Sequence, residues 1–572
     1  MSAAARTART AAAALAALLA SACSGRHPAE FADLVILDGD VQTMNNAQPQ
    51  ARALAIKSGK IVYVGGNAGA HPWIGISTRV LRVAGATVLP GLIDSHIHVM
   101  EGALDRGHCS FEDKPLDIAR IKPIILACAA RTPGTGWVEV LQLNAGGFRA
   151  DNHDLDTILP DRPLLLWAAD GHDAWVNSEA LKRAGINRKS VDPPRGTIVR
   201  DRHGEPNGLL VDSALKLASR LIDKPGATER ERALLETLDD LAKDGITSFM
   251  EANTSEETVR NYVHLAHNNQ LHAHVVMALR CDGTDTEAEF TRLKMLRTLA
   301  ATEPLLRADY IKLFADGIME YPTQSAAMLE PYLDTSGKPG LNLGPTYLAP
   351  EALTQFIQHA DVEGFNIHVH AIGDRATRAA LDAYAGARAH GSQRSYSIAH
   401  LELIDPQDLP RFKALNVFPS LQLQWAQPDN YSVEAVLPYI GAARQQRLYP
   451  ERSLKNAGAT IVGGSDWNVS TFNPFEAMAI AISRRNPQAL QRGELGVNET
   501  LPLHDLYAAY TINAARMLGL DASVGSLQAG KAADLIVLDR HLDDSSPSSD
   551  VLATTVRYTF MNGAMLVGPA KH

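Results

Sequence analysis

The sequence predicts an α/β protein whose centre is a TIM (β/α)8 barrel, joined to a small composite β-sandwich domain formed from both chain ends. Eight apolar, strand-like runs in the middle of the chain predict the barrel, because they alternate with helical stretches such as 351–363 and 375–390. The segment ADLVIL at 32–37 returns almost unchanged as ADLIVL at 533–538. Short strands of this kind cannot bury their apolar faces alone, so we expect the two chain ends to pair with each other.

The first 23 residues have the pattern of an export signal. Arg6 and Arg9 precede an unbroken run of Ala and Leu at 11–20, which is too short to span a bilayer because a helix needs about 20 residues. The run ends in Leu-Ala-Ser-Ala-Cys23, which resembles the cleavage box of bacterial lipoproteins. This resemblance implies cleavage before Cys23, lipidation of its thiol, and an exported lipoprotein of the cell envelope. The alternative is an ordinary secretory signal cut near Ala22, which leaves a periplasmic protein.

The β-sandwich is expected to take residues 31–88 from one end of the chain and 520–567 from the other. Glycines punctuate both segments as turns between apolar runs. The strand-like runs are 33–37, 53–57 and 60–64, and, at the far end, 533–538, 556–560 and 564–567.

Residues 89–519 are expected to form the barrel. Its strand-like runs, in chain order, are 88–99, 246–251, 273–279, 310–314, 366–370, 396–400, 417–421 and 460–466. An insertion at about 100–244 separates the first two runs and contains a strand of its own at 164–169. We expect the insertion to cover the barrel mouth, which is the face that carries the chemistry of TIM barrels.

The bulk composition restricts the partners of the protein. Of its 572 residues, 45% are hydrophobic and 21% are charged, and the net charge is -10 with both signs mixed along the chain. Because no basic stripe is visible, we expect that nucleic acid is not the main partner. Membrane contact is expected only through the lipid anchor, and a homo-oligomer is left open. Cys109, Cys128 and Cys281 are expected to be core thiols, although one pair could bridge in an oxidising compartment.

The strongest chemical signal is the motif Leu-Ile-Asp-Ser-His96-Ile-His98 at the end of the first barrel run. Residues two apart on a strand point to the same face, so the two imidazoles form a ready pair of ligands for a divalent metal. His272/His274 and His368/His370 have the same spacing. The first of these pairs opens a strand, which is the wrong end of a barrel, whereas His370 closes one.

Three further polar residues interrupt or end apolar barrel runs. Lys312 lies inside 310–314, where a buried amine is costly unless it is neutralised or modified. Carbamylation by CO2 would turn it into an anion that bridges two metals, and the alternative is an ion pair with a carboxylate such as Asp316. His400 and Asp466 end their strands, so both are expected at the same rim.

Together these stretches resemble the amidohydrolase superfamily, and within it the YtcJ-like branch (amidohydrolase family 3) that includes N-substituted formamide deformylases. The resemblance covers nearly the whole chain after the signal and rests on motifs at 89–98, 169–178, 312–317, 370–376, 464–467, 510–515 and 524–534. Two departures are visible. Residues 318–324 are not rich in Gly and Ser, and Ala399 stands where a Glu commonly precedes the histidine.

The resemblance implies a set of metal ligands and a cofactor. The expected ligands are His96, His98, Lys312, His370, His400 and Asp466. They would hold one or two divalent ions, with zinc as the expected metal, and Lys312 would be carbamylated if the centre is binuclear. Asp466 is also the expected general base, and His172, in the insertion, is the expected neutral donor to an oxyanion. The expected substrate contacts are His172, Trp175, Asn177 and Tyr321.

The predicted activity is hydrolysis of a non-peptide, amide-type C–N bond in a small molecule by metal-activated water. Two alternatives accompany it: hydrolysis of an ester, lactone or cyclic imide by the same chemistry, and a non-catalytic, lipid-anchored binding protein that retains the barrel.

Overall fold

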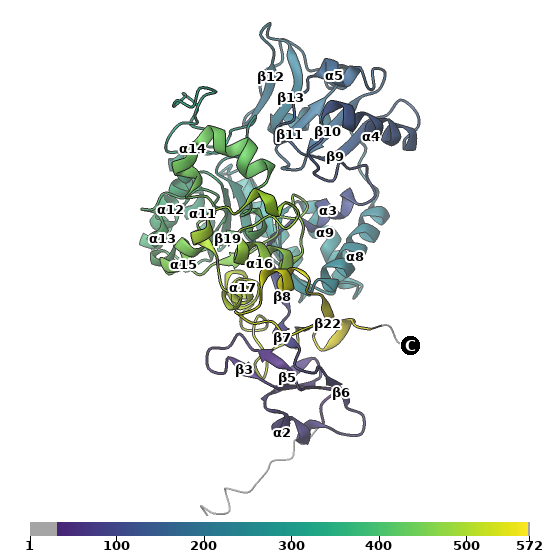
Figure 1. Cartoon of the computed structure of the whole chain (residues 1–572), viewed down its shortest axis with the longest axis vertical. Helices are drawn as coiled ribbons and strands as arrows, with labels where there is room; N and C mark the ends of the chain where they lie inside the picture. Colours follow the sequence, from purple (N-terminus) through teal and green to yellow (C-terminus); the bar gives the residue numbers. More distant parts are fainter. Residues whose placement is uncertain (1–30, 570–572) are drawn as a thin grey trace, which may run out of the picture.

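The computed structural model describes residues 31–569 as three parts that follow one another along the long axis of the molecule (Figure 1). The barrel lies in the middle, the sheet of the insertion lies at one end, and the composite β-domain lies at the other. The signal peptide and Cys23 lie outside the described residues. Within 31–569, no helix combines the length and the apolar character needed to cross a membrane.

Eight parallel strands form the barrel, which confirms the predicted fold class. They are β8 (Leu92–Ile97), β14 (Ile246–Thr254), β15 (His274–Arg280), β16 (Leu306–Phe314), β17 (Asn366–Ala371), β18 (Tyr396–His400), β19 (Val417–Leu421) and β20 (Val462–Gly463). The last strand is short. Just beyond it the Asp466 N–H donates to the His96 carbonyl at 2.7 Å, so the ring closes at the carboxyl ends of the strands.

Helices surround the barrel between successive strands. The principal ones are α8 (Ala227–Lys243), α9 (Glu256–His267), α10 (Glu287–Ala300), α11 (Pro350–Val362), α12 (Asp374–Ala389), α13 (Leu409–Ala414), α15 (Glu451–Asn456), α16 (Pro474–Ser483), α17 (Leu503–Ala509) and α18 (Ile512–Leu518). Their apolar faces and the strands share one hydrophobic core, which includes Leu238, Val259, Leu293, Phe356 and Leu381.

The run predicted as one strand at 88–99 is two strands joined at Gly91. The first, β7 (Thr87–Pro90), pairs with β21 (Leu535–Leu538) of the β-domain, whereas β8 belongs to the barrel. The junction requires glycine, because a Cβ on Gly91 would lie 2.2 Å from the Thr247 Oγ1 atom. The chain therefore passes from one domain into the other across a single tightly packed residue.

The composite β-domain consists of two sheets, and strands from both chain ends share the larger one. Its order is β23-β22-β21-β7-β2-β3, with β2 (Asp40–Gln42), β3 (Gln50–Ala51), β22 (Val556–Met561) and β23 (Ala564–Val567). The smaller sheet has the order β5-β4-β1-β6, with β1 (Leu34–Leu37), β4 (Ala53–Lys57), β5 (Lys60–Gly65) and β6 (Arg79–Arg82). Ile36, Leu54, Val88, Val537 and Phe560 are buried together, which confirms the domain predicted from the repeated ADL segments.

The insertion holds more structure than the single predicted strand. Its sheet has the order β12-β13-β11-β10-β9 and consists of β9 (Val138–Leu143), β10 (Leu164–Ala168), β11 (Asp173–Val176), β12 (Gly196–Arg200) and β13 (Pro206–Asp212). Helices α4 (Ile118–Arg131), α5 (Asn152–Asp156) and α6 (Ser178–Ala184) accompany it, whereas α3 (Val99–Asp105) packs against α8 of the barrel. The insertion has its own hydrophobic core, so its loops are held on a rigid support beside the barrel mouth.

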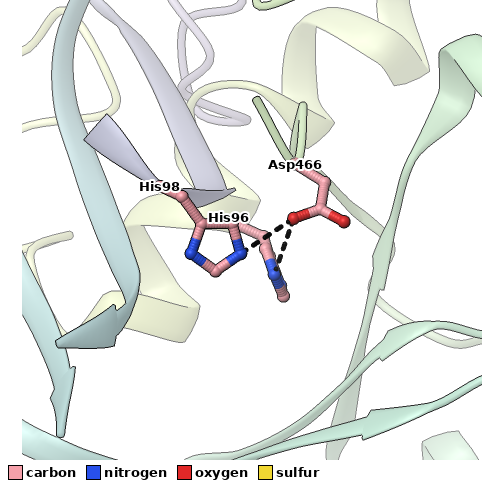
Figure 2. Close-up of side chains that lie close together, drawn as sticks. All are labelled: His96, His98 and Asp466. Carbon is pink, nitrogen blue, oxygen red and sulfur yellow. Dashed lines mark ion pairs between the residues drawn. The ribbon is translucent and has the colours of Figure 1, made fainter. Parts of the chain in front are cut away.

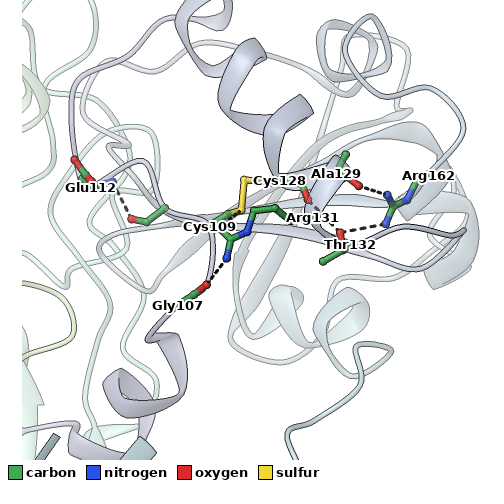
Figure 3. Close-up of a disulfide and its surroundings, with 9 residues drawn as sticks. Gly107, Cys109, Glu112, Cys128, Ala129, Arg131, Thr132 and Arg162 are labelled. Carbon is green, nitrogen blue, oxygen red and sulfur yellow. Dashed lines mark hydrogen bonds between the residues drawn. A yellow bond between two sulfur atoms is a disulfide. The ribbon is translucent and has the colours of Figure 1, made fainter. Parts of the chain in front are cut away.

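A disulfide joins Cys109 to Cys128 within the insertion (Figure 3). Cys128 lies in α4, and the Cα atoms of the two cysteines are 5.9 Å apart. Next to it, Arg131 donates to the Gly107 carbonyl at 2.8 Å. The expectation that these two cysteines are core thiols is wrong, because the fold brings them together across 19 positions of the chain. Cys281 is a buried free thiol, as expected.

Candidate active site

His96, His98 and Asp466 meet at the carboxyl ends of β8 and β20 (Figure 2). The Asp466 Oδ1 atom lies 3.0 Å from His98 Nε2 and 3.3 Å from His96 Nε2. The backbone fixes this arrangement, since the His98 N–H donates to the Trp467 carbonyl at 2.6 Å. One ligand atom from each of the three side chains lies within 4.8 Å of the others, which is a spacing that a single metal ion can bridge.

The other three expected ligands face the same centre from neighbouring strands. Lys312, on β16, places its Nζ 3.4 Å from His96 Nε2. His400, at the end of β18, places its Nδ1 3.7 Å from Asp466 Oδ2. The rings of His370 and His400 have centroids 4.4 Å apart. All six side chains therefore converge at one rim of the barrel.

Two of these residues adopt backbone conformations that non-glycine residues seldom use. His400 has φ of 76° and Asp466 has φ of 53°. Left-handed backbone of this kind costs free energy, and it persists where the surrounding structure imposes it, which is frequently at functional sites. Here it turns both side chains inward at the points where β18 and β20 end.

Burial and neighbouring charge set the protonation of the cluster. Burial lowers the pKa of Lys312 to about 7 and lowers those of His370 and His400 well below the usual value. Burial acts to raise the pKa of Asp466, but the hydrogen bond with His98 and the charges around it outweigh this effect and hold it at about 2. Near neutral pH the cluster therefore offers the neutral imidazoles of His370 and His400, an amine that can lose its proton, and a carboxylate.

The donor set fits a divalent metal ion. Within the described residues, both ring nitrogens of His400 are buried without a hydrogen-bond partner. Buried polar atoms are almost always paired, so two orphaned nitrogens at this centre indicate a ligand. Imidazole nitrogen and carboxylate oxygen are the ligands that zinc and similar ions take in proteins. His96, His98 and Asp466 could hold one ion, and Lys312, His370 and His400 could complete a second site.

His172 brings the insertion to this centre. Its ring lies 5.7 Å from the ring of His370, centroid to centroid, and its Nδ1 pairs with Asp212 Oδ1 at 2.6 Å. Burial acts to lower the pKa of His172, but the hydrogen bond and charge of Asp212 raise it to about 9. The structure thus places a charged donor where the sequence suggested a neutral one.

Trp175 and Asn177, two of the expected substrate contacts, are instead used inside the insertion. Trp175 is buried edge-to-face against Phe148, with ring centroids 5.3 Å apart. Asn177 caps α6 and donates to the Leu159 carbonyl at 2.7 Å. Both side chains stabilise the insertion. This structural role accounts for their place in the motif without any contact to a substrate.

Tyr321, the third of these contacts, lies in the segment after β16. Its ring stacks on that of Tyr439 at 4.7 Å, and the Arg149 guanidinium lies 4.6 Å from its centroid. The ring is partly exposed. It is therefore held between an aromatic ring and a cation that both contact it.

Several polar groups around the centre had no role predicted for them from the sequence. His368 is fully buried and contacts His96 Nδ1 at 2.7 Å. Asp94 accepts from the His96 N–H at 3.0 Å and from the Ser465 N–H at 3.1 Å. Glu251 accepts from the Tyr262 hydroxyl at 2.6 Å. For the first two a signal existed: each stands two residues before a proposed ligand, on the same face of the strand.

Comparison with known proteins identifies the family of the chain. Residues 83–567 match the model of the family described as the amidohydrolase family. "Protein LONG AFTER FAR-RED 3" of Arabidopsis thaliana is 31% identical over 94% of this chain and 91% of its own length. The "N-substituted formamide deformylase" of Arthrobacter pascens is 24% identical over 94% and 98% of the two chains. The "Putative amidohydrolase YtcJ" of Bacillus subtilis is 27% identical over 81% and 85%.

Solved structures share the fold. An uncharacterized metal-dependent hydrolase from Pyrococcus horikoshii superimposes with a TM-score of 0.68 at 21% identity, covering 89% of this chain and 97% of its own. A second, from Pyrococcus furiosus, gives a TM-score of 0.65 at 20% identity, over 89% and 99%. The family resemblance inferred from the sequence motifs is confirmed.

Proposed function

The chain belongs to the amidohydrolase family, and on that premise we propose that it is a metal-dependent hydrolase that cleaves a non-peptide, amide-type C–N bond in a small molecule. The observation that carries this proposal is the convergence of four histidines, one lysine and one aspartate at the barrel mouth. The full-length similarity to an N-substituted formamide deformylase supports an amide-type substrate.

The residues have distinct roles in this proposal. A bound divalent ion lowers the pKa of a water molecule and polarises a carbonyl group. Asp466 takes the proton from the attacking water as the new C–O bond forms, and returns it to the nitrogen as the C–N bond breaks. His172, with its Nδ1 held by Asp212, has Nε2 left to donate to the oxyanion.

The substrate we propose is polar as well as small. Gln422 directly follows β19 and is buried, yet both atoms of its amide lack a hydrogen-bond partner among the described residues. Asp173 Oδ1 and Glu320 Oε2 are buried and unpaired in the same way. Asp173 flanks His172, and Glu320 follows β16, so both belong to loops around the mouth. Groups left unpaired there are available to hydrogen-bond a ligand.

The test is a substrate screen with purified protein of known metal content. The panel pairs each N-substituted formamide or acetamide with the matching ester, lactone or cyclic imide, and product amine or acid is measured by mass spectrometry. We expect amine release from amides that metal removal abolishes and zinc restores. Turnover confined to the esters or imides would support the second hydrolase activity. Ligand binding without turnover would indicate a binding protein.

We further propose zinc as the metal and a binuclear centre in which Lys312 is carbamylated. The low pKa of the buried amine supports this, because only the neutral amine adds to CO2. Elemental analysis should give two zinc ions per chain, and carbon-13 NMR after labelling with bicarbonate should show a carbamate. A single ion with no carbamate would contradict both points.

We also propose that the protein is exported and lipid-anchored through Cys23. The disulfide in the insertion supports export, because disulfides persist in oxidising compartments. Metabolic labelling with a palmitate analogue should mark the wild-type protein and not Cys23→Ser. Equal labelling of both, or labelling of neither, would contradict the anchor.

A further inference from the structure

A buried chain of three side chains runs from His96 away from the metal-binding centre. His368, on β17, places its Nε2 2.7 Å from His96 Nδ1 and its Nδ1 2.7 Å from the Ser397 Oγ atom. All three residues are fully buried. His368 and Ser397 are paired in register across β17 and β18, so the barrel itself sets their contact. Resting on the proposed function, we infer that His368, supported by Ser397, is a positioning residue that orients His96 toward the metal.

The direction of the hydrogen bonds follows from which nitrogen of His96 faces the metal site. His96 Nε2 lies 3.3 Å from Asp466 Oδ1 and 3.4 Å from Lys312 Nζ, so it is the nitrogen that would bind the ion. A neutral imidazole with a free lone pair on Nε2 carries its proton on Nδ1. That N–H must donate, and the atom opposite it is His368 Nε2.

The remaining hydrogen bonds of this series then have one consistent direction. His368 Nε2 accepts from His96, so the neutral His368 ring carries its proton on Nδ1 and donates to the Ser397 Oγ atom. The Ser397 hydroxyl in turn faces the Ile367 carbonyl at 3.5 Å, which accepts its proton. Each donor and each acceptor in this series of hydrogen bonds is used once. The reversed direction would put a proton on His96 Nε2, where the ion must bind.

Loss of these hydrogen bonds should weaken metal binding by His96. Without an acceptor opposite Nδ1, His96 would populate the tautomer with its proton on Nε2, and its ring would lose the contact that fixes its rotation. Partners of this kind typically change metal affinity about 10- to 100-fold when they are removed. A residue that merely fills the barrel lumen would alter stability and leave metal affinity unchanged.

The experiment compares zinc affinity by chelator competition in the wild-type protein and three variants. His368→Leu removes the acceptor at similar volume, His368→Gln retains a side-chain acceptor, and Ser397→Ala removes only the far end of the chain. His274→Gln is the matched control, because His274 opens β15 at the opposite end of the barrel and pairs with Asp534 at 2.9 Å. Circular dichroism and thermal unfolding establish that each variant is folded.

We expect about a 10- to 100-fold loss of zinc affinity in His368→Leu and a smaller loss in His368→Gln and Ser397→Ala, with no change in the control. Nitrogen-15 NMR of histidine-labelled, metal-free protein should also show His96 with its proton on Nδ1, and Ser397→Ala should shift the His368 signals. If His368→Leu does not fold, the zinc affinity of Ser397→Ala and the tautomer of His96 determined by NMR test the inference instead. Unchanged affinity in the folded variants, or a proton on His96 Nε2, overturns the inference.

The two proposals fail in different ways. A wild-type protein that binds zinc and hydrolyses no member of the panel contradicts the proposed C–N hydrolysis, while the affinities and the tautomer still decide the role of His368. A protein that hydrolyses amides with unchanged zinc affinity in every folded variant supports the hydrolase and overturns the positioning role.

Discussion

Replacing Asp466 by Asn tests the centre most directly. The carboxylate lies between His96, His98 and His400, and its pKa of about 2 keeps it ionised throughout the working range of pH. Asn has nearly the same size, so the substitution leaves no cavity and the barrel should close as before. The variant loses the negative charge and the only carboxylate of the six side chains in the centre.

The expected magnitudes follow from the geometry. A positioned general base contributes about 100- to 10,000-fold to the rate, which is roughly 2.7–5.5 kcal/mol of activation free energy. The folded state lowers the pKa of Asp466 from 3.8 to about 2, so the ionised group contributes about 2 kcal/mol of stability. Because the folded pKa is the lower one, that stability is present above pH 4 and is lost as the pH falls toward 2.

The assay measures amine release from the best substrate of the panel, with zinc content and thermal unfolding determined on the same samples. Asp466→Asn should unfold a few degrees lower, retain most of its zinc, and lose at least 99% of kcat. The control is Asp239→Asn, on an aspartate of α8 whose side chain is 67% exposed. A kcat within about threefold of the wild type, at equal zinc content, would refute the assignment of Asp466 as the base.

Three further predictions concern the other members of the site. Lys312→Ala should lose one zinc equivalent by elemental analysis; unchanged stoichiometry would mean that this lysine is not a bridging ligand. His172→Phe should lower kcat about 100- to 1,000-fold with zinc content preserved, and an effect confined to KM would assign His172 to substrate binding alone. Zinc affinity should rise with pH. Burial lowers the pKa of His98, but its hydrogen bond with Asp466 raises it above the usual value, so below that pKa the ion must displace a proton. Chelator competition between pH 6 and 9 checks the slope, and a flat profile would contradict it.

The regular parts of this protein could be predicted because they depend on local pattern. Alternating apolar runs and amphipathic helices predict a barrel, and in a parallel barrel the ends of all strands meet at one rim. His96, Lys312, His370, His400 and Asp466 could therefore be assigned to one site although they are spread over 370 positions of the chain. The repeated ADL segments identified the composite β-domain for the same reason, since two strands of equal pattern need a common core.

The sequence by itself therefore determined the barrel and the shared β-domain, and it identified six side chains that meet at one rim. Only the tertiary structure decided which residues contact each other where the contact does not follow from the spacing of residues along one strand or helix. Three contacts join segments that are distant along the chain. They are the pair of His172 with Asp212, which the antiparallel strands β11 and β13 bring together, the disulfide between Cys109 and Cys128, and the contact of His368 with His96. The motif that contains Trp175 and Asn177 was compatible with two arrangements. Its side chains could contact a substrate or be buried in the insertion, and the structure shows that they are buried. Spacing along a strand sets which face a side chain takes, but distances between strands and loops depend on how the whole chain packs.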